Sequence, residues 1–177
     1  SKIWDIQVLS PTRKGLLGEA NLNNVIQAIL NPSSKDKKEK QVRDIVFREG
    51  DKVMQIKNNY SLEWHRIGGD GENKGVGVFN GDMGYIETID EERKVLSVVF
   101  DDERRVIYEF MFLDELELAY AITIHKSQGS EFKVVVMPTF MGSAFLMNRN
   151  ILYTGITRAK ELVVVVGNQR SLQYMVN

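Results

Sequence analysis

The sequence predicts an α/β protein whose parallel sheet is interrupted by a small β-barrel insert. Short apolar segments near both ends of the chain alternate with helical patterns, whereas the middle holds short β-type segments separated by turns. The length of 177 residues suits one domain with a modest insert. We therefore expect residues 1–46 and 116–177 to form one discontinuous α/β domain, and residues 47–115 to form the insert.

The N-terminal part predicts one strand and one helix. Residues 6–11 are a short apolar segment ended by Pro11, which is typical of a buried strand. After Asn21 the apolar residues have the spacing of an amphipathic helix, ended by Pro32: Leu22, Val25, Ile26, Ile29 and Leu30. The highly charged residues 35–40 are expected to form a solvated linker.

The middle of the chain changes to the two-residue period of strands. Strands are predicted at residues 53–57, 85–89, 95–100 and 105–110. Turn residues such as Gly81-Asp82 separate them. Residues 58–81 are expected to contain a glycine-dense loop without a core of its own. Short strands at this spacing favour a small barrel.

The C-terminal part returns to alternating strands and helices. Apolar strands are predicted at 119–123, 134–137 and 162–166, with a helix at 148–160 and a last helical turn at 171–176. Strands that are apolar on both faces are typical of a parallel sheet covered on both sides.

The composition excludes several classes of protein. With 23 basic and 24 acidic residues the net charge is −1, so any contact with phosphate must be local. The chain has no cysteine, which excludes a disulfide scaffold. It has two histidines, His65 and His125, far apart in the sequence, and this argues against a metal site. No apolar segment approaches the about 20 residues of a membrane span, and no signal peptide is visible. We expect a cytoplasmic protein without membrane contact and, since the first residue is not Met, a piece of a longer chain.

The glycine-rich residues 68–77 do not have the spacing of a phosphate-binding P-loop. That motif needs Gly-Lys-Ser/Thr between a strand and a helix, whereas Lys74 is followed by Gly75 and neither flank has a helical pattern. We interpret this stretch as a hairpin or loop tip.

Two polar stretches hold the candidate chemistry. Residues 123–132 lead from an apolar strand into a dense polar turn, at the end of a parallel strand where open α/β sheets bind ligands. In residues 149–160, Thr154, Thr157 and Arg158 point away from the apolar side of a helix. From spacing alone, an arginine there also fits the ordinary role of complementing the helix dipole.

Taken together, these stretches resemble the C-terminal motor half of RecD-like superfamily 1B DNA helicases, the 5′-to-3′ branch that includes the exodeoxyribonuclease V alpha subunit. Residues 8–15, continuing through 22–32, are similar to helicase motif IV and its following helix. Residues 123–132 are similar to motif V and residues 152–160 to motif VI. Segments 50–55 and 78–84 look like the SH3-like barrel that this branch carries inside its second RecA-like domain. The resemblance implies a RecA-like sheet flanked by helices and interrupted by an SH3-like barrel.

The resemblance also implies a half-motor that works with ATP and Mg²⁺. The P-loop and the Mg²⁺ ligands would belong to the first RecA-like domain of the same chain, before Ser1. Arg158 would be the arginine finger and Arg13 a second γ-phosphate sensor, because a guanidinium is always charged and holds two phosphate oxygens. Gly129 and Glu131 would lie near the nucleotide, with Glu131 accepting a ribose hydroxyl.

Single-stranded DNA is the second ligand that the resemblance implies. Thr123, His125 and Ser127 would donate hydrogen bonds to backbone phosphates, and Lys126 would add charge. In the insert the expected contacts are Lys57, Asn58 and Tyr60, with Tyr60 offering a stacking face. Nuclease or helicase subunits are further candidate partners.

We therefore expect a fragment of an ATP-dependent 5′-to-3′ DNA helicase of repair and recombination, inactive alone because it lacks a P-loop. Two alternatives stay open. One is the helicase half of a conjugative relaxase, which shares these motifs. The other is a non-enzymatic module whose barrel binds a single strand or a protein.

Overall fold

The computed structural model describes residues 5–68, 73–139 and 149–167. Their contacts divide the chain into two compact units, Ser1–Ile26 with Tyr120–Asn177 and Gln27–Ala119. We call the first the sheet unit and the second the barrel unit. The domain limits predicted from the sequence, at residues 46 and 116, stay a prediction.

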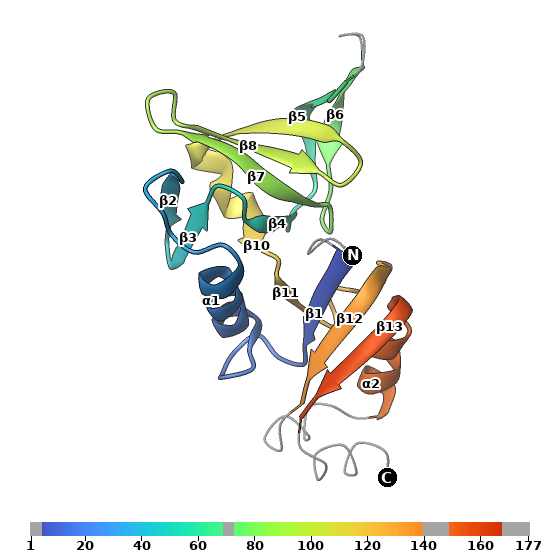
Figure 1. The fold of residues 1–177 in the computed structure, drawn as a ribbon. Helices are drawn as coiled ribbons and strands as arrows, with labels where there is room; N and C mark the ends of the chain where they lie inside the picture. Colours follow the sequence, from blue (N-terminus) through green and yellow to red (C-terminus); the bar gives the residue numbers. More distant parts are fainter. Residues whose placement is uncertain (1–4, 69–72, 140–148, 168–177) are drawn as a thin grey trace. The chain divides into compact units, whose positions relative to one another are not determined.

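The sheet unit is built on four parallel strands in the order β11-β1-β12-β13 (Figure 1). They are β1 (Ile6–Ser10), β11 (Ala121–Thr123), β12 (Phe132–Pro138) and β13 (Ala159–Val166). Ser10 pairs with Thr123, so β1 and β11 end together, and Phe132 pairs with Ala159, so β12 and β13 begin together. The predicted parallel sheet is therefore confirmed, and its registers define a carboxyl edge and an amino edge.

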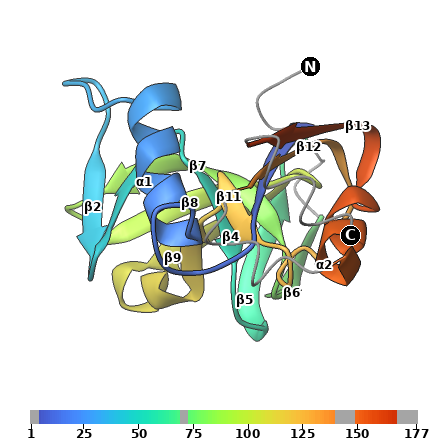
Figure 2. The ribbon, with the colours of Figure 1, turned by 90° about the horizontal axis from the view of Figure 1, so that it is seen from below.

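Helix α2 (Arg149–Ile156) packs against β12 and β13 (Figure 2). It is shorter than the helix predicted to residue 160, because the amide of Arg158 bonds the carbonyl of Gly155 and closes the last turn. The carbonyl of Arg158 then accepts a hydrogen bond from the amide of Phe132, which draws the chain into β13. The helical turn predicted at 171–176 lies outside the described residues.

Helix α1 (Glu19–Leu30) starts at Glu19, slightly before the predicted start, because the amide of Glu19 bonds the carbonyl of Thr12. Its buried residues differ from those expected of an apolar stripe. Val25 and Ile29 are 47% and 70% exposed, whereas polar residues at four-residue spacing are buried: Glu19, Asn23, Gln27 and, just after the helix, Asn31. The helix was therefore predicted correctly and its buried face was not.

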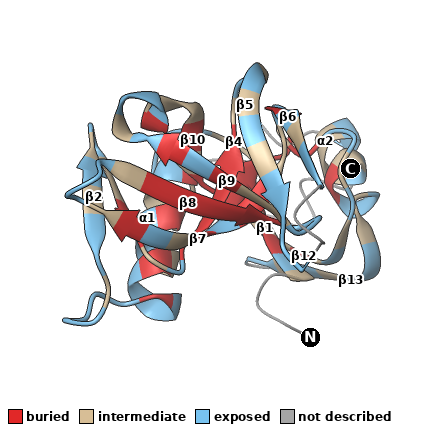
Figure 3. Cartoon of the chain, turned by 90° about the horizontal axis from the view of Figure 1, so that it is seen from above, coloured by how far each residue is buried: buried red, intermediate tan, exposed pale blue. Residues whose placement is uncertain are grey.

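The barrel unit is a curled antiparallel sheet in the order β10-β4-β7-β8-β9-β5-β6, with a separate hairpin of β2 and β3. Its elements are β2 (Glu39–Val42), β3 (Ile45–Arg48), β4 (Lys52–Gln55), β5 (Asn59–Arg66), β6 (Lys74–Val78), β7 (Met83–Asp90), β8 (Val95–Phe100), β9 (Arg104–Glu109), the 3₁₀ helix η2 (Phe110–Glu115) and β10 (Leu116–Leu118). Figure 3 shows β8 buried along most of its length, whereas β2 and β5 are largely exposed. The predicted barrel is confirmed.

The glycine-dense loop predicted within residues 58–81 is wrong for most of that segment, whereas the hairpin or loop tip predicted around residues 68–77 agrees with its pairing. This segment contains β5 and β6, which pair with each other, and β5 also pairs with β9. Trp64 faces Gly75 across the hairpin, where a Cβ on Gly75 would lie 2.4 Å from Cζ2 of Trp64. The aromatic ring covers the glycine and stabilises a strand that its composition disfavours.

The charged linker predicted at residues 35–40 is correct only in part. Glu39 and Lys40 already belong to β2, where Lys40 lies opposite Phe47 of β3. Lys37 precedes the strand, and its ammonium donates a 2.6 Å hydrogen bond to Oδ1 of Asn31. This contact ties the segment to the residue that follows α1.

Candidate functional site

A pocket of about 390 Å³ lies at the carboxyl edge of the parallel sheet, in the sheet unit. Because β1 and β11 are parallel and end together, the loops that follow them meet there. The lining residues are Pro11, Thr12, Arg13, Thr123, His125 and Lys126. The pocket thus joins four residues that the sequence singled out: Arg13, Thr123, His125 and Lys126.

Two hydroxyl groups of the predicted DNA site close the turn after β11. Oγ1 of Thr123 accepts a 3.2 Å hydrogen bond from the amide of Lys126. Ser127 is fully buried, and its hydroxyl donates to the carbonyl of Ile124. The predicted DNA contact of Ser127 stays a prediction, and in this structure the hydroxyl holds the turn. His125 is exposed at the same turn.

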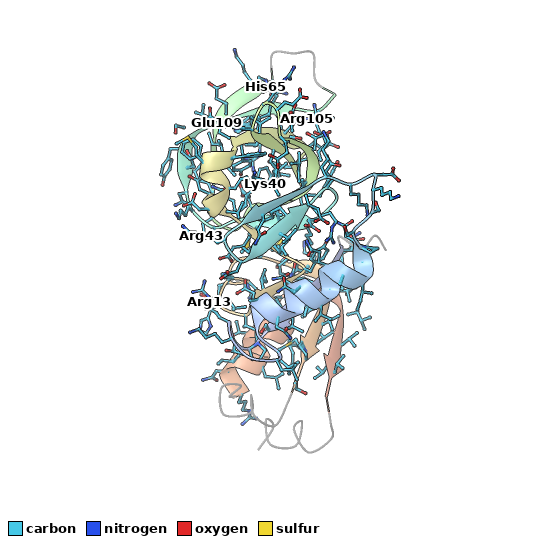
Figure 4. The ribbon with its side chains drawn as sticks, turned by 90° about the vertical axis from the view of Figure 1, so that its left-hand side faces the viewer. Arg13, Lys40, Arg43, His65, Arg105 and Glu109 are labelled. Carbon is cyan, nitrogen blue, oxygen red and sulfur yellow. The ribbon has the colours of Figure 1, made fainter. Side chains whose placement is uncertain are left out.

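The charges around this pocket are partly compensated. Nζ of Lys126 lies 2.7 Å from Oε1 of Glu19, the buried acidic residue in the first turn of α1. Arg13 is exposed on the loop between β1 and α1, as labelled in Figure 4. Within residues 5–68, 73–139 and 149–167, its guanidinium has no hydrogen bond or ion pair. Arg13 is therefore the uncompensated positive charge of the pocket.

The amino edge of the same sheet holds the other predicted nucleotide residues. Glu131 directly precedes β12, and Arg158 directly precedes β13. The carboxylate of Glu131 pairs with Lys160 at 3.1 Å, and both side chains are more than half exposed. Such a surface pair contributes about 0–1 kcal/mol, so Glu131 is free to exchange Lys160 for another partner. Gly129 is exposed in the turn before Glu131.

The guanidinium of Arg158 is incompletely hydrogen-bonded. Its Nε is buried and has no hydrogen-bond partner among the described residues, while one terminal nitrogen lies 3.4 Å from Oγ1 of Thr157. A buried donor left without a partner costs about 1–3 kcal/mol, more when it is charged. Carboxylate and phosphate oxygens are the acceptors that a guanidinium fits best, so an anionic ligand would complete its hydrogen bonds.

Strand direction separates the two arginines. The backbone of Arg13 follows the end of β1, whereas the backbone of Arg158 precedes the start of β13. β12, which lies between these strands, has 7 residues, and at roughly 3.3 Å per residue the two edges are about 20 Å apart. A shared γ-phosphate for Arg13 and Arg158 stays a prediction that this topology does not favour.

In the barrel unit, the predicted DNA contacts lie around the start of β5. Nζ of Lys57 pairs with Asp114 at 3.1 Å, and Oδ1 of Asn58 accepts a hydrogen bond from the amide of Asn80. Tyr60 is 70% exposed, and its ring meets that of Phe79 edge-on at 5.6 Å. The sequence reasoning did not single out Phe79, which lies just before the Asn80-Gly81 turn.

Other polar groups of the barrel unit are enclosed in hydrogen-bond networks. The Tyr108 hydroxyl donates to Oε1 of Gln55 at 2.7 Å, and burial raises the pKa of Tyr108. Nε2 of Gln55 donates in turn to Glu115, which also accepts from Asn59. Gln55 and Tyr108 are fully buried, so this network stabilises the fold.

Two further findings concern metal ions and membranes. Among the described residues, no group of three or more His, Asp or Glu is arranged to hold a metal ion. Within the same residues, every helix is too short or too polar to cross a membrane.

Comparison with known proteins identifies the family. A family model described as the SH3 domain of ATP-dependent RecD-like DNA helicases matches residues 22–100, and a model of the UvrD-like helicase C-terminal domain matches residues 118–166. An ATP-dependent RecD2 DNA helicase of Deinococcus radiodurans is 33% identical over 168 residues, which cover 95% of this chain and 21% of that protein. This chain belongs to the RecD-like DNA helicases. The sequence-based assignment to the family is thereby confirmed.

A second curated relative and a solved structure are also similar to this chain. A conjugal transfer protein TraA of Rhizobium radiobacter is 31% identical over 130 residues, covering 72% of this chain and 10% of that protein. A crystal structure of Pif1 helicase from Bacteroides, in complex with ADP-AlF3 and ssDNA, matches with a TM-score of 0.57 and 18% identity, covering 95% of this chain and 43% of that one. The fold is therefore that of a helicase motor domain with its SH3-like insert, and the chain spans about a fifth or less of these curated relatives.

Proposed function

We propose that this chain is the second motor domain, with its barrel insert, of an ATP-dependent 5′-to-3′ DNA helicase. The proposal rests on family membership and on one observation, the buried Nε of Arg158 that has no partner among the described residues. A charged donor in that state at the amino edge suits an anionic ligand supplied from outside the sheet unit.

The amino edge would serve ATP. Arg158 would stabilise the charge that develops on the transferred phosphoryl group, as arginine fingers do. Glu131 would accept a hydrogen bond from a ribose hydroxyl after leaving Lys160, and Gly129 would let the backbone approach the nucleotide. A first RecA-like domain elsewhere in the complete protein would supply the P-loop and the ligands of Mg²⁺, and ATP binding would close the two domains on each other.

The carboxyl edge and the barrel would serve single-stranded DNA. Thr123, His125 and Lys126 line the pocket where the backbone would pass, while Tyr60, flanked by Lys57 and Asn58, would stack on a base. The Bacteroides Pif1 helicase of similar fold was crystallised with both a nucleotide analogue and ssDNA. Several relatives are named as RecD subunits of RecBCD enzymes, so nuclease and helicase subunits are candidate partners in the cytoplasm.

The test is Arg158→Ala in the complete protein. We expect turnover of ATP to fall about 10³-fold while binding of ATP and of single-stranded DNA persists, because the finger acts on the transition state. Arg149→Ala is the matched control, since Arg149 is an exposed arginine at the start of α2, the helix that precedes Arg158. Equal ATP turnover by the two variants would contradict the role of Arg158, and absence of DNA-stimulated ATP hydrolysis by the complete wild-type protein would favour a non-enzymatic module. The 177-residue chain alone is expected to show no ATP hydrolysis.

A second candidate is the helicase half of a conjugative relaxase, favoured by the similarity to the TraA protein. The motor chemistry of the two candidates is the same, so the Arg158 variant does not separate them. Nicking of supercoiled plasmid by the complete protein does, since only a relaxase cleaves one strand.

A further inference from the structure

The pocket at the carboxyl edge of the sheet contains donors and positive charge and is open to an anion. It is lined by Arg13, Lys126, His125, two threonines and a proline, and no carboxylate is among its lining residues. Its volume of about 390 Å³ is many times the roughly 30 Å³ share of one water molecule, so a phosphodiester group fits. The pocket therefore has the chemistry of a phosphate site.

The positive charge available in that pocket comes from Arg13. Lys126 lies 2.7 Å from the buried carboxylate of Glu19, an ion pair whose side chains are only 19% and 8% exposed. Moving Lys126 to a ligand would leave the Glu19 carboxylate buried without that partner, which is strongly unfavourable. Arg13 has no such partner among the described residues and can bind without breaking an interaction.

The loop that carries Arg13 is held in place by its own hydrogen bonds. The buried Ser10 hydroxyl lies within hydrogen-bond distance of the carbonyls of Thr12 and Leu17. The amide of Glu19 bonds the carbonyl of Thr12, and a Cβ on Gly18 would lie 2.5 Å from the backbone of Lys14, so only glycine fits. The backbone of Arg13 is thus fixed before a ligand arrives, which lowers the entropy lost on binding.

We propose that Arg13 binds a backbone phosphate of single-stranded DNA, with His125 and Thr123 beside it, instead of the γ-phosphate of ATP. This inference rests on the proposed helicase function and changes the role of one residue within it. The shared chemistry is a phosphate oxygen, which either ligand offers. The position of Arg13 favours DNA over ATP, because Arg13 lies beside Thr123 and His125, at the edge of the sheet opposite Arg158.

Binding of this kind does not depend on base identity. The lining side chains hold donors suited to phosphate, and the guanidinium fork of Arg13 can hold two oxygens of one phosphate. Replacement by Lys keeps the charge and loses the fork, so Arg13→Lys should bind with an affinity between those of wild type and Arg13→Ala.

The experiment titrates fluorescent dT20 with this chain by anisotropy, at about 50 to 200 mM salt. We expect Arg13→Ala to weaken binding about tenfold, and to reduce the slope of log affinity against log salt by about 0.7, which is one phosphate contact on a single strand. Lys14→Ala is the matched control, because it removes the same charge from the adjacent exposed residue, which does not line the pocket. An identical effect with dA20 would confirm that bases are not read.

Competition with ATP tests the alternative that Arg13 contacts the nucleotide. We expect ATP at about 1 mM to leave dT20 bound to the wild-type chain. If ATP displaces dT20 from wild type and not from Arg13→Ala, Arg13 is a nucleotide contact and the inference is overturned. Equal affinities of Arg13→Ala and Lys14→Ala would also overturn it, while leaving the proposed function intact. Absence of dT20 binding by the wild-type chain at the lowest salt concentration would remove both the DNA-binding edge and the inference.

Discussion

The barrel unit and the sheet unit differ in what their charged side chains contact. In the barrel unit the guanidinium of Arg104 contacts both Asp82 and Asp102, and that of Arg105 makes two 2.7 Å hydrogen bonds to Glu87. In the sheet unit Arg158 has a buried donor without a described partner, and Arg13 makes no described ion pair.

This difference indicates a division of roles. Polar groups that satisfy one another fix a shape, whereas polar groups left incomplete at the edges of a parallel sheet are available to ligands. Substitutions in the barrel networks should therefore lower stability, and substitutions at the sheet edges should lower binding or turnover. The following predictions test that separation.

Asp51 of the barrel unit should show the largest effect on stability. It is fully buried, and its carboxylate accepts hydrogen bonds of 2.7 Å from Gln27, Asn31 and the amide of Arg48. Asp51→Ala leaves these donors without an acceptor, so we expect the free energy of unfolding to fall by about 3–5 kcal/mol. Urea unfolding, followed by the fluorescence of Trp64 in a Trp4→Phe background, measures it in the barrel unit.

Asp44→Ala is the control for this loss, because Asp44 is exposed in the turn between β2 and β3. We expect it to change the free energy of unfolding by no more than about 0.5 kcal/mol. A loss below about 1 kcal/mol for Asp51→Ala would mean that the buried network does not hold the barrel unit together, and the contrast with the sheet unit would fail.

Periodicity predicted the strands well and failed where a side chain compensates for composition. The parallel strands of the sheet unit and the central strands of the barrel could be read from apolar spacing. A hairpin or loop tip was predicted at residues 68–77, but the strands β5 and β6 themselves could not be read in this way. Their stability depends on Trp64 covering Gly75, a pairing between residues of two different strands. The buried face of α1 was hidden for the same reason: Asn23 is buried because its amide makes two 2.8 Å hydrogen bonds with the backbone of Ala121.

The candidate site was predicted as a set of residues and not as an arrangement. Motif resemblance named Arg13, Arg158 and Thr123 without showing which of them share an edge of the sheet. That information lies in strand direction and register, since Ser10 pairs with Thr123 and brings Arg13 next to the turn after β11. Phe79 was missed because a single aromatic residue before a turn has no distinctive spacing.

Tyr60 is the residue of the barrel unit that is expected to contact DNA. It therefore tests whether the barrel unit, like the sheet unit, also binds a ligand. Tyr60→Ala should weaken binding of dT20 by about 5- to 150-fold, since one stacked base contributes about 1–3 kcal/mol. The free energy of unfolding should change little, because Tyr60 is 70% exposed. Anisotropy titration and urea unfolding of the same variant separate the two effects.

Tyr85→Ala serves as the control for Tyr60, because Tyr85 is a partly exposed tyrosine on β7 of the same unit. Phe79→Leu should weaken binding less than Tyr60→Ala, since it removes only the edge-on support of the Tyr60 ring. If Tyr60→Ala and Tyr85→Ala bind dT20 equally well, the barrel unit has no stacking site at Tyr60 and acts as a scaffold alone.

The ion pair of Glu87 and Arg105 should make the smallest contribution to the free energy of unfolding, and this contribution should depend on pH. Hydrogen bonds from Arg105 lower the pKa of the Glu87 carboxyl below its usual value. A carboxyl whose pKa is lower in the folded state stabilises the fold above its unfolded pKa, near about 4.3, and loses this contribution as the pH falls through the folded pKa. Both side chains are partly exposed, so we expect less than about 1 kcal/mol.

Urea unfolding of wild type and Glu87→Gln at about pH 7, 5 and 3 measures this contribution. The variant should be less stable at neutral pH, and the gap should narrow in acid, where the wild-type carboxyl takes up its proton. In an Arg105→Gln background the effect of Glu87→Gln on the free energy of unfolding should depend less on pH, because the main donor that lowers the pKa of Glu87 is gone while Ser97 still donates to the carboxylate. A gap that stays constant in the wild-type background would show that the ion pair contributes nothing, and that the barrel unit is held by its buried networks alone.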